Sequence, residues 1–120
     1  MSKVLLVDDN PSQIELMELY LREVGHTVIR LTDAKQALNK ALEQKPDVIV
    51  TDIVMPGMSG FELCRRLKQH PGTARVPIVI CSSKNQEIDR LWGMKQGATA
   101  YLTKPFSKEQ LLRAVNLAVV

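Results

Sequence analysis

Three acidic residues and one lysine each follow directly on a short apolar run. Asp8 and Asp9 come after the first run, Asp52 after another, and Lys104 after the last. If these runs are parallel strands, their carboxyl ends lie along one edge of a sheet, where open α/β folds bind ligands. We therefore expect the three carboxylates and the lysine to lie close together at that edge.

Carboxylates crowded at one edge repel one another, and a divalent cation is the usual way to hold them together. Lys104 would add a second, movable positive charge beside them. Such a pocket suits a phosphoryl group, because phosphoryl oxygens bind cationic donors strongly. One of the carboxylates, Asp52, could be the acceptor of that group.

The length of 120 residues predicts a single domain spanning residues 1–120. A hydrophobic fraction of 45% and a charged fraction of 24% are ordinary for a soluble globular protein. No apolar run approaches the ~20 residues of a membrane helix, and a strand pattern follows directly on Met1-Ser2-Lys3. We expect a cytoplasmic protein with no membrane span and no output domain.

The charge and the cysteines argue against other classes of protein. The net charge is +3, but the basic residues are scattered and form no zinc-finger, RNA-binding or helix-turn-helix pattern. Nucleic acid is therefore not an expected partner. Cys64 and Cys81 could form one bridge, but both lie in apolar stretches outside any metal-like cluster. We expect buried, reduced thiols.

Strand and helix patterns alternate five times along the chain. The expected strands are Lys3–Val7, Thr27–Leu31, Asp47–Thr51, Val76–Cys81 and Thr99–Thr103. Several are nearly continuous in Val, Ile and Leu, which indicates strands buried on both faces. This alternation predicts an α/β fold with a parallel sheet between two layers of helices.

The helices between these strands show apolar residues at 3.6-residue spacing. The predicted apolar faces are Ile14, Met17, Leu21 and Val24; Ala34, Ala37, Leu38, Ala41 and Leu42; Phe61, Cys64 and Leu67; Ile88 and Leu91; and Leu111, Leu112, Val115, Ala118 and Val119. The predicted N-terminal caps are Asn10, Ser59, Ser83 and Ser107, and the predicted glycine stops are Gly25 and Gly97.

Four motifs follow one another in a fixed order. They are Val7-Asp8-Asp9-Asn10, Thr51-Asp52-x-x-Met55-Pro56-x-Met58-x-Gly60, Cys81-Ser82-Ser83, and Gly97-Ala98-x-x-Tyr101-Leu102-x-Lys104-Pro105-Phe106. Together they resemble the receiver domain of two-component response regulators over essentially the whole chain. The resemblance implies a flavodoxin-like, doubly wound five-stranded parallel sheet of order 2-1-3-4-5 with five flanking helices. The segment from Trp92 to Ala98 is also similar to stand-alone receivers of chemotaxis and twitching motility.

The resemblance also implies roles for the acidic residues. Asp52 would accept a phosphoryl group from a sensor histidine kinase or a histidine phosphotransfer protein. Asp9 would bind Mg²⁺ directly and Asp8 through a metal-bound water, while Asp52 and the main-chain carbonyl of Val54 would complete the protein ligands. The chain would then catalyse only its own phosphorylation and dephosphorylation, and we do not expect a separate enzymatic activity.

The resemblance implies a switch as well. Lys104 would pair with a phosphoryl oxygen, and Ser82 would supply its hydroxyl to the same group. Movement of Ser82 would favour an inward rotamer of Tyr101. This would remodel the face formed by the fourth helix, fifth strand and fifth helix for a downstream protein.

Each of these residues has a structural alternative when taken alone. Asp8 and Asp9 could form a strand-ending turn, Asp52 could begin a turn, Lys104 could be a surface lysine, and Tyr101 could be an edge-strand aromatic. However, all of the polar residues that interrupt the apolar pattern fall at the same end of different expected strands. That coincidence favours the functional interpretation.

Other classes of protein fit less well. The intact acceptor set argues against a constitutive interaction module, and Val54 stands where a haloacid-dehalogenase-like phosphatase would have a second aspartate. A flavodoxin would have a hydroxyl-rich loop after the first strand.

Trp92 could complete a helix's buried face or meet a partner, and we expect partial burial. The oligomeric state is left open.

Val54 and Lys84 are expected to lengthen the life of an aspartyl phosphate, because neither side chain can orient the hydrolytic water as an acceptor would. Exchanging Val54→Asn together with Lys84→Glu should speed the loss of phosphate in Mg²⁺ buffer by roughly tenfold or less. The decay of the phosphorylated protein measures this effect, and equal or slower decay in the double variant would contradict it.

Overall fold

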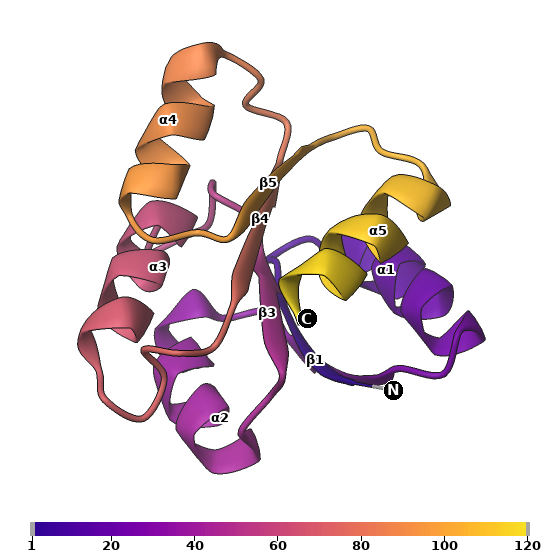
Figure 1. The fold of residues 1–120 in the computed structure, drawn as a ribbon, viewed down its shortest axis with the longest axis horizontal. Helices are drawn as coiled ribbons and strands as arrows, with labels where there is room; N and C mark the ends of the chain where they lie inside the picture. Colours follow the sequence, from indigo (N-terminus) through magenta and orange to yellow (C-terminus); the bar gives the residue numbers. More distant parts are fainter. Residues whose placement is uncertain (1, 120) are drawn as a thin grey trace.

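The computed structural model of the chain describes residues 2–119 and forms one five-stranded parallel sheet (Figure 1). The order is β2-β1-β3-β4-β5, which confirms the predicted flavodoxin-like arrangement. The elements are β1 (Lys3–Val7), α1 (Pro11–Glu23), β2 (Thr27–Leu31), the short 3-10 helix η1 (Ala34–Gln36), α2 (Ala37–Gln44), β3 (Val48–Thr51), α3 (Gly60–Gln69), β4 (Ile78–Ser82), α4 (Glu87–Lys95), β5 (Ala100–Thr103) and α5 (Lys108–Ala118).

Helices cover both faces of the sheet, so its middle strands have no solvent-facing side. Figure 1 shows α1 and α5 on one face and α2, α3 and α4 on the other. Successive residues of a strand point to opposite faces. Leu5 and Val7 therefore join the core beneath α2 and α3, whereas Val4 and Leu6 join the core beneath α1 and α5. This two-sided burial explains the continuous apolar runs of β1, β3 and β4.

The predicted bounds of β1 and β2 are confirmed, and those of β3, β4 and β5 differ from the structure by one or two residues, mostly at the start of a strand. β4 begins at Ile78, two residues after the predicted Val76. The intervening Pro77 lacks an N–H, although its carbonyl accepts a bond from Ile49 N at 3.0 Å. At its other end β4 extends to Ser82, because Ser82 pairs with Thr103 of β5.

Most of the predicted helix signals are confirmed. The Asn10 side chain accepts hydrogen bonds from the first turn of α1, and Ser107 forms a complete capping box with the start of α5. Ser59 accepts a bond from the Glu62 N–H at 3.1 Å, which is one half of the predicted box. Gly25 and Gly97 take positive φ angles of 93° and 107°, as expected of left-handed stops.

The predictions for α4 were wrong in two respects. Ser83 does not cap the helix, because α4 begins four residues later with Gln86 as its cap. The predicted apolar face is also turned outward, since Ile88 is 65% and Leu91 is 56% exposed. The buried residue of the helix is Gly93, and its small size lets the helix pack closely on the edge of the sheet.

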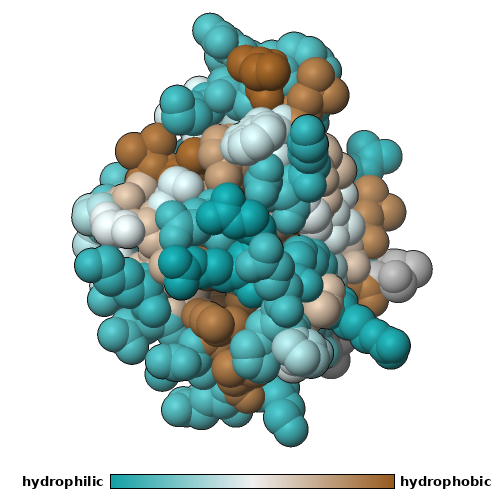
Figure 2. All heavy atoms as spheres, turned by 90° about the vertical axis from the view of Figure 1, so that its left-hand side faces the viewer, coloured by the Kyte–Doolittle hydropathy of each residue, from teal (hydrophilic) through white to brown (hydrophobic). Residues whose placement is uncertain are grey.

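This outward face gives α4 an apolar surface, seen at the top of Figure 2. Trp92 belongs to that surface and is 44% exposed, which agrees with the expected partial burial and excludes a place in the core. The Lys95 ammonium lies 5.7 Å from the centre of a Trp92 ring and partly covers it.

Both cysteines are buried thiols, as predicted. Cys64 and Cys81 are unpaired and belong to the cores on opposite faces of the sheet. Burial raises the pKa of Cys64 to about 11 and that of Cys81 to about 12. Thiolate is therefore scarce at neutral pH, and both side chains act as small apolar groups.

Between residues 2 and 119, no helix has the length and apolarity needed to cross a membrane.

Candidate functional site

The predicted site residues converge at the carboxyl edge of the sheet. Val7 of β1 pairs with Thr51 of β3, so the next residues, Asp8 and Asp52, leave the sheet side by side. The main chain extends this pairing by one bond, from Asp52 N to Val7 O at 3.1 Å. Carboxylate oxygens of Asp8, Asp9 and Asp52 all lie within 4.8 Å of one another, which confirms the expected acidic cluster.

Lys104 reaches this cluster from the end of the edge strand β5. Its backbone N–H donates to the Ser82 carbonyl at 2.8 Å, which sets the start of its side chain beside the end of β4. The ammonium donates to Asp8 Oδ2 at 3.0 Å and lies 3.6 Å from Asp52 Oδ2. One cation therefore bridges two carboxylates that come from different strands.

Asp8 is the most deeply buried charge of the cluster, with a side chain only 1% exposed. Its Oδ1 atom accepts a bond from the Asn10 N–H at 2.9 Å, and its Oδ2 atom accepts the bond from Lys104. Burying a carboxylate without partners costs several kcal/mol. These two bonds offset that cost and engage both oxygens of Asp8.

The local environment also shifts the ionisation of the other two partners. Burial raises the pKa of Asp52, although Lys104 and a 2.7 Å bond from the Ile53 N–H oppose that rise. Burial alone would lower the pKa of Lys104, but its bond to Asp8 and the two nearby carboxylates outweigh this effect and raise it. Lys104 is therefore a firmly protonated cation at neutral pH.

Gly60 is a part of the site to which the sequence prediction assigned no role. A Cβ atom there would lie 2.0 Å from the Asp52 carbonyl oxygen and 2.9 Å from the Ile53 Cα atom. The Gly60 N–H also donates to the Ile53 carbonyl at 2.8 Å. The start of α3 thus packs directly on the backbone of the candidate acceptor, and only glycine leaves room for that approach.

Ser82 and Tyr101 lie on the α4 side of the cluster. The Ser82 hydroxyl is buried and accepts a bond from the Lys84 N–H at 3.2 Å. The Tyr101 hydroxyl donates to the Lys84 carbonyl at 2.6 Å, and the ring is 7% exposed. Tyr101 therefore holds the inward position, and burial raises the pKa of its phenol. One residue, Lys84, links the two hydroxyls through its backbone.

The donor set fits a hard divalent cation such as Mg²⁺, which prefers oxygen ligands and few carboxylates. The Asp9 carboxylate is exposed, and no hydrogen bond or ion pair to it is present among residues 2–119. Asp8, by contrast, has both oxygens engaged. The direct contact of Asp9 with Mg²⁺ and the water-mediated contact of Asp8 stay predictions. The Val54 side chain is 62% exposed, and the role of its carbonyl stays a prediction.

The chain belongs to the response regulator receiver domain family, and the sequence model of that family matches residues 4–116. It is a receiver domain of two-component signalling, as the motifs predicted. Protein PilH of Pseudomonas aeruginosa is 40% identical over 116 residues, a match that covers 97% of this chain and 96% of PilH. The transcriptional regulatory protein PhoP of Bacillus subtilis is 38% identical, but the match covers only 45% of PhoP.

Solved structures agree with this assignment. Chemotaxis protein CheY4 of Vibrio cholerae superposes with a TM-score of 0.92 at 33% identity, covering 98% of both chains. The receiver domain of a sensor histidine kinase from P. aeruginosa superposes with a TM-score of 0.90 at 30% identity, covering 98% of this chain and 97% of that one. That structure holds a magnesium ion coordinated in its active-site cleft.

The acidic cluster predicts opposite effects for two neighbouring aspartates. In a chelating buffer, Asp9→Asn should stabilise the protein by about 0.5–2 kcal/mol, since it removes repulsion at a functional site. Asp8→Asn should destabilise it by about 1–3 kcal/mol, because it leaves the Lys104 ammonium facing an amide. Melting temperatures of the two variants test this contrast, and shifts of the same sign would contradict it.

Gly60→Ala should destabilise the fold by about 1–3 kcal/mol, because the new methyl group meets backbone atoms that cannot move aside cheaply. Gly72→Ala is a matched control, since the nearest atom to its Cβ is the flexible Cδ2 end of Leu42 at 2.6 Å. Urea unfolding of both variants measures the difference. Equal losses of stability would show that Gly60 is not needed for the approach of α3 to Asp52.

Proposed function

We propose that this receiver accepts a phosphoryl group on Asp52 in the presence of Mg²⁺ and thereby switches a protein-binding surface. The donor is the phosphohistidine of a sensor kinase or of a histidine phosphotransfer protein. The observation that carries the proposal is the convergence of three carboxylates within 4.8 Å, bridged by the Lys104 ammonium. This arrangement combines a nucleophile, metal ligands and a cation for the phosphoryl oxygens.

In the proposed transfer, a carboxylate oxygen of Asp52 attacks phosphorus in line with the bond to the donor histidine. That P–N bond breaks, its electron pair returns to the imidazole, and a P–O bond to Asp52 forms. The Asp52 Oδ1 atom accepts the Ile53 N–H at 2.7 Å, so this bond and the packing of Gly60 orient the carboxylate.

A divalent cation on Asp9 and Asp52 would neutralise charge on the incoming phosphoryl oxygens. Lys104 supplies the second positive charge. Its ammonium lies between Asp8 and Asp52, so a small rotation of the side chain would carry it to a phosphoryl oxygen. The bond from the Lys104 backbone N–H to Ser82 would keep the Lys104 main chain in place during that rotation. The chemistry is confined to the chain's own aspartate, and the receiver is not expected to act as a separate enzyme.

The proposed output passes through Ser82 and Tyr101 to the surface formed by α4, β5 and α5. A phosphoryl group on Asp52 adds about two negative charges and several strong acceptors. Ser82 can donate its hydroxyl to that group, and the Lys84 backbone connects this movement to Tyr101. The partner is a downstream protein that binds the altered surface. A location in the cytoplasm stays a prediction from the sequence.

A small phosphodonor with Mg²⁺ should add one acid-stable, base-labile phosphoryl group to the chain at Asp52. Asp52→Asn should abolish the added mass and leave the fold intact, because the amide has nearly the same shape as the carboxylate. Asp47→Asn is a matched control, since Asp47 is an exposed aspartate at the opposite edge of the sheet. Intact-mass analysis measures the transfer, and equal labelling of Asp52→Asn would refute the assignment.

Ser82→Ala should still accept the phosphoryl group, because it removes neither the nucleophile nor a metal ligand. It should lose most of the phosphate-dependent change in hydrogen exchange of α4 and α5, since the link from acceptor to Tyr101 is broken. Ser83→Ala, which alters the exposed neighbouring hydroxyl, should behave as wild type. A full exchange response in Ser82→Ala would exclude this route for the signal.

A further inference from the structure

The inward Tyr101 ring rests against a helix residue that has no side chain. Gly93 is the buried residue of α4, and a Cβ atom there would lie 3.2 Å from the Tyr101 Cδ2 atom and 3.0 Å from the Ile80 Cδ1 atom. Both distances are tight for a methyl group. Glycine inside a helix is unfavourable relative to alanine. The space that it leaves for the ring explains its presence at this position.

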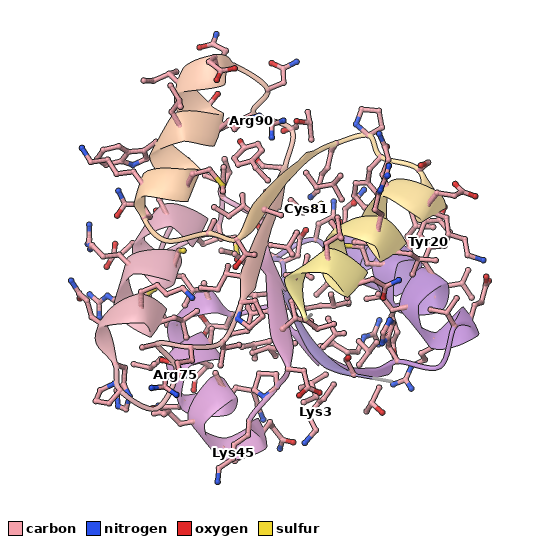
Figure 3. The ribbon with its side chains drawn as sticks, viewed as in Figure 1. Lys3, Tyr20, Lys45, Arg75, Cys81 and Arg90 are labelled. Atoms are coloured by element: carbon pink, nitrogen blue, oxygen red, sulfur yellow. The ribbon has the colours of Figure 1, made fainter. Side chains whose placement is uncertain are left out.

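Arg90 covers the same ring from one turn earlier in α4. Figure 3 shows its side chain reaching from the helix toward the strands. The guanidinium donates to the Tyr101 carbonyl at 3.3 Å, and its central carbon lies 5.3 Å from the centre of the ring. The contact with the ring face is a cation–π interaction, which favours the inward ring.

The third contact is made at the tip of the side chain, where the hydroxyl donates to the Lys84 carbonyl at 2.6 Å. Gly93, Arg90 and the Lys84 carbonyl thus enclose the ring from its side, its face and its tip. None of these contacts uses an atom of Asp52, Asp8 or Asp9. The seat formed by these three groups is therefore in place without a phosphoryl group on Asp52, although Lys84 also binds Ser82 through its N–H.

We propose that Arg90 and Gly93 are positioning residues that hold Tyr101 inward before phosphorylation, so that the receiver rests with its output surface partly switched. The inference rests on the proposed role of Tyr101 as the switch. Phosphorylation then shifts an equilibrium that already favours the inward ring, instead of driving the ring inward from solvent. Arg90 is exposed, so its contribution is modest and corresponds to about a two- to fivefold change in the inward-to-outward ratio.

The test measures the ring position in protein that has met no phosphodonor. Nuclear Overhauser contacts between the Tyr101 ring and the Ile80 Cδ1 methyl group report the inward state, and methyl relaxation dispersion reports the outward fraction. Arg90→Met should raise the outward fraction about two- to fivefold. Gly93→Ala should raise it by at least as much, because the new methyl group occupies the seat. Arg65→Met, an exposed helical arginine on α3, is the matched control and should leave it unchanged.

Unchanged outward fractions in both Arg90→Met and Gly93→Ala would overturn the proposal, and a change in only one would remove the other residue from the seat. A purely structural role would lower the melting temperature without moving the ring, so thermal melts are recorded in parallel. All three variants should still be labelled at Asp52 at the wild-type rate. Since the ring is measured without a phosphodonor, failure here is distinct from failure of phosphotransfer.

Discussion

The burial of the Asp8 carboxylate against the Lys104 ammonium is the interaction on which the site depends. A carboxylate with 1% of its side chain exposed is tolerable only when it is paired and hydrogen-bonded. Lys104 provides that pairing at 3.0 Å and extends to within 3.6 Å of Asp52. Two carboxylates that would otherwise repel each other are thereby held side by side.

The parallel sheet makes this pairing possible. Because β1 and β3 lie side by side in register, Asp8 and Asp52 leave the sheet at the same level. The pairing of Ser82 with Thr103 brings Lys104 to that level from β5. The helices complete the site, since Gly60 lets α3 approach the backbone of Asp52 closely. The framework of the site thus comes from buried strands.

At the β5 edge of the sheet, α4 has fewer buried residues than α1, α2, α3 or α5. Only Gly93 of α4 is buried, and the larger apolar residues of that helix face outward. A helix held by so little core can shift at modest cost, which suits the switching role proposed for it. Tyr101 lies between this helix and Ser82, and the backbone of Lys84 connects the two hydroxyls. Ser82 and Tyr101 are therefore joined by a short chain of direct contacts.

The sequence by itself determined the strands, the parallel sheet and the acidic cluster. Buried strands are continuous apolar runs, and the residues that end them, such as Asp8 and Asp52, must share one edge. Tertiary structure decided what local patterns do not encode. Ile88 and Leu91 carry helical spacing yet face solvent, because the sheet edge accepts only Gly93. Likewise, the contact of Gly60 with the Asp52 carbonyl and that of Arg90 with Tyr101 join separate elements. Periodicity reports which residues share a face, but only packing decides where that face points.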